Sequence, residues 1–158
     1  MLTIKNVDIN LKDTVTCGQC FRFFPCEDES YTMILSDRVI NIKQSGRNLI
    51  VESNNENNLE NVIREYFDLN RDYVLLNKEL LSFDLSLKDC IEGSKGLKIL
   101  KQEPFEKLIS YIMSQNNKVT RISNSINFIS QKYGKKVEFK NNEYYLFPSF
   151  EQIKNIDM

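Results

Sequence analysis

The chain has 158 residues, 41% of them hydrophobic, and a formal net charge of −1, which is enough apolar material for a buried core in one domain or slightly more. No apolar run reaches the roughly 18 residues of a membrane span, and the charged N-terminal stretch lacks a secretory signal, so we expect a cytoplasmic protein with four reduced cysteines. The absence of histidine excludes Ser-His-Asp and Cys-His catalysis within this chain, and zinc sites that use histidine.

The two halves of the chain differ in charge. Residues 1–79 carry 9 basic and 13 acidic side chains, whereas residues 80–158 carry 12 basic and 9 acidic ones, so the net charges are −4 and +3. A partner that carries phosphates would therefore be expected to contact the second half. Ordinary scatter can also produce an imbalance of this size.

Short strands are predicted in the first third of the chain. Apolar and β-branched residues alternate or cluster over 30–37, 38–44 and 48–53, and the aromatic stretch 20–24 is also strand-like. A Gln-Ser-Gly-Arg turn separates the last two of the three apolar segments. Short strands joined by short turns predict an antiparallel sheet.

Helices are predicted to follow the sheet. Apolar residues recur at helical spacing over 59–67, and Asn57 or Asn58 can cap the start of this helix. Two shorter helices are predicted near 72–82 and 85–92, followed by a glycine-containing stretch that ends them.

Two longer amphipathic helices are predicted in the last third of the chain. The first opens at Glu103-Pro104, where the missing N–H of proline costs nothing, and Asn116-Asn117 ends it. Its apolar face is expected to contain Phe105, Leu108, Ile109, Ile112 and Met113. The second runs over 118–133 and stops at Gly134, with Val119, Ile122, Ile126, Ile129 and Tyr133 directed inward.

A β-hairpin and one more helix complete the prediction. The hairpin has apolar strands on either side of an Asn141-Asn142 turn pair. Ser149 and Gln152 are spaced as the capping box of a helix that has only two turns before Met158. We therefore expect the native chain to continue beyond residue 158.

The Cys17-Gly18-Gln19-Cys20 stretch admits a redox, a metal or a packing interpretation. Redox pairs of this spacing lie at a helix N-terminus, whereas a strand is predicted to follow here, and Cys26 and Cys90 are too far apart in sequence to form a second close pair for zinc. We favour the packing interpretation, in which the glycine is the active element because it permits a β-bulge or the close approach of another molecule.

Five stretches together resemble the 8-oxoguanine DNA glycosylase family. Cys-Gly-Gln-Cys-Phe-Arg-Phe at 17–23 is similar to the Ser-Gly-Gln-Ser-Phe-Arg-Trp of that family, and Tyr-Phe-Asp-Leu at 66–69 to its Tyr-Phe-x-Leu. Further matches are Leu-Lys-Gln-Glu-Pro-Phe-Glu at 100–106, the Ser-Gln-Asn-Asn and Arg-Ile residues within 112–122, and Phe-Pro-Ser at 147–149. The departures are both cysteines, Phe23 in place of tryptophan, and Lys118, where the family often has a third asparagine.

The resemblance implies roles for four residues in a DNA repair enzyme that turns a damaged base out of the duplex. The carbonyl of Gly18 would accept the N7–H that 8-oxoguanine has and guanine lacks. Asn116, with Asn117 beside it, would fill the hole left in the duplex and pair with the orphaned cytosine, and Arg121 would also contact that cytosine. The residues alone favour a helix C-cap for the two asparagines and a solvated charge for Arg121. The partner would be double-stranded DNA containing oxidised guanine, with no cofactor and no metal.

The resemblance also implies which parts of the enzyme these residues contain. Residues 1–97 would form an α+β N-terminal domain with an antiparallel sheet similar to the TATA-binding-protein fold, and 98–158 would begin an α-helical catalytic domain. The lysine that attacks the sugar and its supporting aspartate are expected beyond residue 158, so this chain alone should be inactive as glycosylase and AP lyase. Such a chain should expose apolar faces on 105–113 and 119–133.

Two further hypotheses stay open from the sequence. One is a fragment of an alkylpurine DNA glycosylase, which shares this layout. The other is a non-enzymatic α+β module that binds DNA or protein and is complete at 158 residues.

Overall fold

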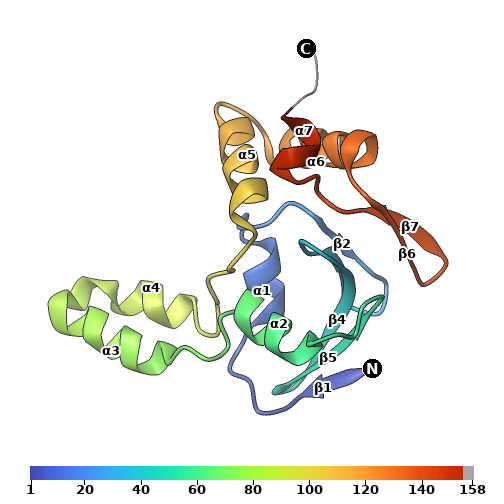
Figure 1. Ribbon diagram of the computed structural model, residues 1–158. Coiled ribbons are helices and arrows are strands. Elements are labelled where there is room, and N and C mark those ends of the chain that lie inside the picture. The colour runs from blue at the N-terminus through green and yellow to red at the C-terminus, as the bar shows by residue number, and fades with distance from the viewer. Residues whose placement is uncertain (155–158) are drawn as a thin grey trace.

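A computed structural model describes residues 1–154 and places a five-stranded antiparallel sheet at the centre of the N-terminal part (Figure 1). The strand order is β1-β5-β4-β3-β2. The strands are β1 (Leu2–Ile4), β2 (Phe23–Pro25), β3 (Tyr31–Ile34), β4 (Val39–Ser45) and β5 (Asn48–Ser53). Ser45 pairs with Asn48 across the two-residue turn Gly46-Arg47, and the positive φ of 57° at Gly46 suits such a turn. The predicted antiparallel α+β fold is therefore confirmed.

Two helices fill the concave face of the sheet, α1 (Leu11–Thr16) and α2 (Leu59–Tyr66) (Figure 1). Alternate strand residues such as Ile40, Ile42 and Val51 have no exposed surface and pack in the same cluster as Leu11 and Ile63. Leu100 belongs to this cluster as well, three residues past the predicted domain boundary.

Three local predictions for the N-terminal part were wrong or incomplete. Strand β1 and helix α1 were missed, and the predicted strand 20–24 is a strand only at Phe23–Pro25. Helix α1 has six residues, of which Thr14, Val15 and Thr16 are β-branched and poor helix formers, so its stability comes from burial against the sheet. The signal that could have found α1 is its N-cap, because the side chain of Asn10 accepts a hydrogen bond from the Asp13 amide at 3.1 Å.

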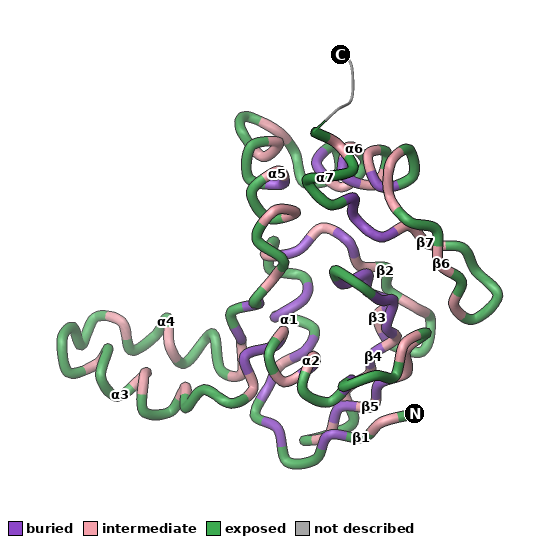
Figure 2. The backbone as a smooth tube through the Cα atoms, in the orientation of Figure 1, coloured by how far each residue is buried: buried purple, intermediate pink, exposed green. Residues whose placement is uncertain are grey.

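A helical arm projects from the body of the protein (Figure 1). It consists of α3 (Tyr73–Phe83), a short 3-10 turn η1 (Leu85–Leu87) and α4 (Lys88–Gly93), close to the two helices predicted at 72–82 and 85–92. None of these elements contains a buried residue, and Figure 2 shows the arm in the colours of exposed and intermediate residues only. Its base is fixed by Asp68, a buried carboxylate that accepts a hydrogen bond from the Tyr73 hydroxyl and pairs with Lys101 and Arg71.

The C-terminal part contains α5 (Pro104–Ser114), α6 (Val119–Tyr133), the hairpin β6 (Lys136–Phe139) and β7 (Asn142–Tyr145), and α7 (Phe150–Ile153). The predicted capping box of Ser149 and Gln152 is present. The hairpin turn is Lys140-Asn141 rather than Asn141-Asn142, because Phe139 pairs with Asn142 and the two residues between them have the positive φ values, 49° and 61°, that this two-residue turn requires.

The apolar face predicted for α5 is wider than the face that the structure buries. Phe105, Ile109 and Met113 pack against a cluster formed by Ile122 and Ile126 of α6 and Phe147. In contrast, Leu108 and Ile112 are 54% and 57% exposed. The reason is that the described neighbours of α5 in this cluster cover only one side of the helix.

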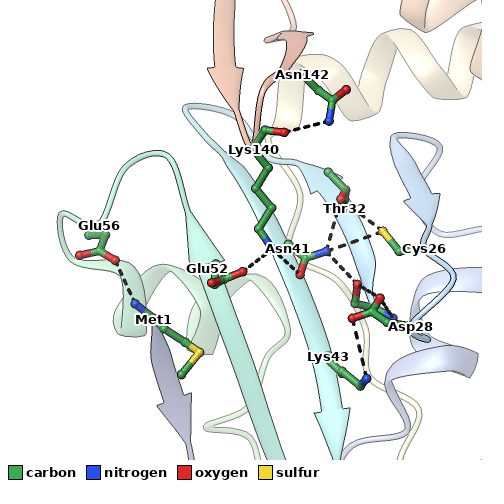
Figure 3. A network of polar contacts seen from close by, with 11 residues as sticks. Met1, Cys26, Asp28, Thr32, Asn41, Lys43, Glu52, Glu56, Lys140 and Asn142 are labelled. Carbon is green, nitrogen blue, oxygen red and sulfur yellow. Dashed lines mark hydrogen bonds and ion pairs between the residues drawn. The ribbon is translucent and has the colours of Figure 1, made fainter.

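The hairpin β6–β7 joins the C-terminal part to the outer face of the sheet. Val39 and Ile34 are buried there against Leu146 and the hairpin side chains. At the hairpin tip, Lys140 pairs with Glu52 and donates to the Asn41 side chain at 3.3 Å (Figure 3). Outward-facing positions of a sheet strand are therefore covered by an element about a hundred residues away in sequence.

No helix within residues 1–154 is long and apolar enough to cross a membrane.

Candidate nucleic-acid interface

Gly18 lies in an exposed turn directly after α1. Its φ is +90°, a conformation that favours glycine, and a Cβ built there would meet no atom within 4 Å. No hydrogen bond among residues 1–154 occupies its carbonyl oxygen. The predicted β-bulge is wrong, because the turn follows a helix instead of interrupting a strand pair. Gly18 is nevertheless exposed, and its carbonyl is left without a hydrogen-bond partner among the described residues.

Gln19 connects this turn to the segment that leads into α5. Its side-chain nitrogen donates to the Lys98 carbonyl at 2.7 Å, and its side-chain oxygen accepts from the Leu100 amide at 3.0 Å. Its own carbonyl accepts from the Gln102 side chain at 2.6 Å and from the Lys107 ammonium at 2.7 Å. The sequence analysis did not predict these contacts. The only available signal was that the Gly-Gln stretch and the Lys-Gln-Glu-Pro stretch both lie in motifs that resemble the same family.

A buried ion pair lies behind the turn. Nη1 of Arg22 is 3.7 Å from Oε2 of Glu106 on α5, and Nη2 donates to the Tyr145 carbonyl of β7. The Arg22 side chain is only 3% exposed. Burial lowers the pKa of Arg22 and raises the pKa of Glu106, and in each case it outweighs the attraction between the two charges. The pair holds the segment after Gly18 against both α5 and the hairpin.

The other three predicted residues lie in or just after the turn between α5 and α6, and they differ in whether their side chains are already engaged. Asn116 is exposed, has a left-handed φ of 51°, and its side chain makes no hydrogen bond among residues 1–154. The side chain of Asn117 donates to the Met113 carbonyl at 3.2 Å, so it caps the end of α5. Arg121 is exposed in the first turn of α6 and has no ion pair within the described part of the chain. Asn116 and Arg121 can thus contact an external partner, whereas Asn117 is already engaged.

The two parts of the candidate interface lie at opposite ends of α5. Lys107, which holds the turn of Gly18, is in the first turn of this helix, and Asn116 lies just past its last residue. A helix of 11 residues spans about 16 Å. Helix α5 therefore connects the residue that contacts the turn of Gly18 with the turn that carries Asn116.

The cysteines of the first quoted stretch do not form a redox site. Cys17 caps the C-terminal end of α1, whereas redox-active cysteines of this spacing lie at a helix N-terminus. Cys20 is 4% exposed, and burial raises its pKa to about 12. Within residues 1–154, no three Cys, Asp or Glu side chains are grouped so that they could hold a metal ion.

Lys98 is the one buried lysine among residues 1–154, and its contacts indicate a structural role. Its ammonium lies 4.0 Å from the centroid of the Tyr73 ring and 3.9 Å from Oδ2 of Asp8. Burial lowers the pKa of Lys98. The contact with Tyr73, the first residue of α3, helps to anchor the helical arm. The catalytic lysine and aspartate that the resemblance implies are expected beyond residue 158, so that expectation lies outside the described residues.

Comparison with known proteins agrees with the motifs. Residues 1–108 match the family described as 8-oxoguanine DNA glycosylase, N-terminal domain. An N-glycosylase/DNA lyase of Saccharomyces cerevisiae is 27% identical, over 96% of this chain and 44% of its own length. The solved 8-oxoguanine glycosylase/lyase of Clostridium acetobutylicum, in complex with duplex DNA containing cytosine opposite 8-oxoguanine, is 40% identical with a TM-score of 0.90, over 98% of this chain and 53% of that one.

A solved 3-methyladenine DNA glycosylase from Archaeoglobus fulgidus shares the fold at 21% identity and a TM-score of 0.68, over 98% of this chain and 58% of that one. This chain thus spans about half the length of the relatives it matches. On the match over residues 1–108, the chain belongs to the 8-oxoguanine DNA glycosylase family and contains its N-terminal domain.

Proposed function

We propose that the protein containing these residues is a DNA glycosylase with AP lyase activity, which removes 8-oxoguanine from opposite cytosine in duplex DNA as part of base excision repair. The observation that carries the proposal is that α5 links two exposed features. In its first turn, Lys107 holds the turn of Gly18, whose carbonyl has no hydrogen-bond partner among residues 1–154, and the exposed Asn116 and Arg121 follow its last residue.

The Gly18 carbonyl supplies the chemistry that distinguishes the damaged base. A carbonyl oxygen is only an acceptor, and 8-oxoguanine offers it an N7–H that guanine does not have. A Cβ built at Gly18 would meet no atom within 4 Å, so no neighbouring side chain crowds the backbone on that side. The cysteines that replace the family's serines do not interfere, because Cys20 is buried away from the turn and a backbone carbonyl acts independently of its flanking side chains.

Asn116 and Arg121 supply the chemistry for an orphaned cytosine. The asparagine amide both donates and accepts hydrogen bonds, and it is short enough to enter the space from which a base has left the stack. Arginine donates to the acceptors of the cytosine edge, and the net positive charge of residues 80–158 favours the adjacent phosphates. Because Asn117 is engaged as a helix cap, we assign the intercalating role to Asn116 alone.

The bond-breaking groups are proposed to lie in a further helical part of the protein. We propose 1–97 as the N-terminal domain and 98–158 as the beginning of the catalytic domain. Leu108, Tyr111 and Ile112 form one exposed apolar face of α5, at 54%, 63% and 57% exposure, which that further part would cover. We also propose a cytoplasmic location, with association with the nucleoid if the protein is bacterial.

The test is a cleavage assay on the protein at its native length. We expect release of 8-oxoguanine from a duplex with cytosine opposite, nicking of the strand, and a covalent enzyme–DNA adduct when borohydride reduces the Schiff base. A duplex with 3-methyladenine at the same place serves as the second substrate. Preferential release of 3-methyladenine would favour the alkylpurine hypothesis, and binding of DNA without release of either base would favour a non-enzymatic module.

Two neighbouring asparagines provide a matched pair of variants for the same assay. Asn116→Gly keeps the left-handed backbone and should reduce excision without lowering the melting temperature. Asn117→Ala should lower the melting temperature through loss of the cap, at a cost of about 1 kcal/mol, with a smaller effect on excision. The reverse pattern would contradict our assignment.

A further inference from the structure

Gln19 has the most completely satisfied polar groups of the turn that contains Gly18. Its side chain bonds the backbone at Lys98 and Leu100, and its carbonyl accepts from Gln102 and Lys107, in four hydrogen bonds of 2.6 to 3.0 Å. A further contact joins its Nε2 to Sγ of Cys17 at 3.2 Å. All four main partners lie within residues 98–107, at least 79 positions away in sequence.

These bonds occupy the carbonyl oxygen and the side-chain N–H donors of Gln19. A carbonyl oxygen has two lone pairs, and both are used by Gln102 and Lys107. The two hydrogens of the side-chain amide are directed to Lys98 and Cys17, and the amide oxygen accepts from Leu100. Gln19 is therefore held mainly by contacts within the protein, to residues 98–107.

Gly18 needs such an anchor. It has no side chain to pack, a Cβ at its position would touch nothing, and glycine moves freely between positive and negative φ. The Gly18 carbonyl shares one planar peptide unit with the Gln19 nitrogen. Fixing Gln19 on both its side chain and its carbonyl therefore fixes the direction in which the Gly18 oxygen points.

We propose that Gln19 is a positioning residue for lesion recognition: held by Gln102 and Lys107, it orients the Gly18 carbonyl and thereby sets discrimination between 8-oxoguanine and guanine. This inference rests on the function proposed above. Because Lys107 lies in the first turn of α5, the same contacts tie the lesion reader to the helix that ends at Asn116.

The test compares two substrates of the native-length protein, one with 8-oxoguanine opposite cytosine and one with an abasic site opposite cytosine. The abasic site has no base to read, so its cleavage reports folding, DNA binding and lyase chemistry without lesion recognition. For Gln19→Ala we expect kcat/KM for excision to fall about tenfold or more, as for the loss of several hydrogen bonds, while abasic-site cleavage stays close to that of wild type. Gln131→Ala, an exposed glutamine of α6, is the control and should change neither.

Lys107 provides a second variant with little risk to folding, because its side chain is exposed and makes one bond to the turn. Lys107→Met should weaken excision in the same selective way but less, and Lys107→Arg, which keeps a donor, should restore it. Equal losses on both substrates would show that Gln19 only stabilises the fold, and unchanged excision would show that it does not orient Gly18; either result overturns the inference. A wild-type protein that processes neither substrate would instead refute the proposed function.

Discussion

Gly134 offers a direct test of how the hairpin is joined to the helix that carries Arg121. This residue ends α6, and its φ of −84° is accessible to any residue, so its conformation does not require glycine. The lack of space around Gly134, however, does require glycine. A Cβ built at Gly134 would lie 1.9 Å from the carbonyl oxygen of Leu146 and 2.5 Å from that of Ser130. Gly134→Ala therefore forces two backbone segments apart.

The cost of this substitution follows from the atoms that must move. Real Cβ contacts are essentially never below 3.0 Å, so the carbonyl of Leu146 must shift by more than an ångström. Overpacking of this kind costs about 1–3 kcal/mol, or more where only backbone can yield. Alanine recovers about 0.4–1 kcal/mol by restricting the unfolded chain. The clash dominates, and for a chain of this length each kcal/mol corresponds to about 2–4 °C in melting temperature.

The assay is thermal unfolding followed by circular dichroism, with Gly93→Ala as the matched control. Gly93 is the last residue of α4, and a Cβ there meets nothing within 4 Å. We expect Gly134→Ala to melt several degrees below the wild type, and Gly93→Ala to melt at or slightly above it. If both variants had the same melting temperature, Leu146 would not approach the end of α6 as closely as described, and the described position of the hairpin would be wrong as well.

Three further predictions concern the interface, the buried ion pair and the cysteines. Arg121→Ala in the native-length protein should relax the preference for cytosine opposite the lesion by about 1–3 kcal/mol; equal excision opposite cytosine and adenine in both proteins would refute that role. Burial raises the pKa of Glu106 above its ordinary value of 4.5. The contribution of Glu106 to the stability of the fold is therefore complete below pH 4.5 and is lost as the pH rises through the raised pKa. In the Glu106→Gln variant, the melting temperature should therefore depend less on pH in this range. The same pH dependence in the variant and the wild type would contradict the raised pKa of Glu106. Cys17→Ser with Cys20→Ser should leave excision largely intact, and in the unmodified protein Cys20 should resist alkylation at pH 8 because its pKa is raised to about 12; a large loss of activity would restore the redox hypothesis.

Local chemistry in the sequence was sufficient for most of the elements. The start of α5 at Pro104, the stop of α6 at Gly134 and the capping box at Ser149 each depend on contacts within a few residues, and the structure has all three. The antiparallel sheet followed in the same way from short apolar strands and the tight turn at Gly46. The order of the motifs also indicated the family, which the match over residues 1–108 shows.

Contacts between distant segments decided the rest. Helix α1 exists because the sheet buries it, although its β-branched residues disfavour a helix. Helical spacing could not tell which side of α5 is covered, since Phe105 and Leu108 are both large apolar residues and only Phe105 packs against the buried cluster that contains Ile126. The sequence likewise presents Asn116 and Asn117 as equivalent, and only the folded chain shows that one caps a helix while the other faces outward. The contacts of Gln19 could not be found by local reasoning, because each of its main partners lies some eighty residues away in the segment 98–107 and meets it only in the folded chain.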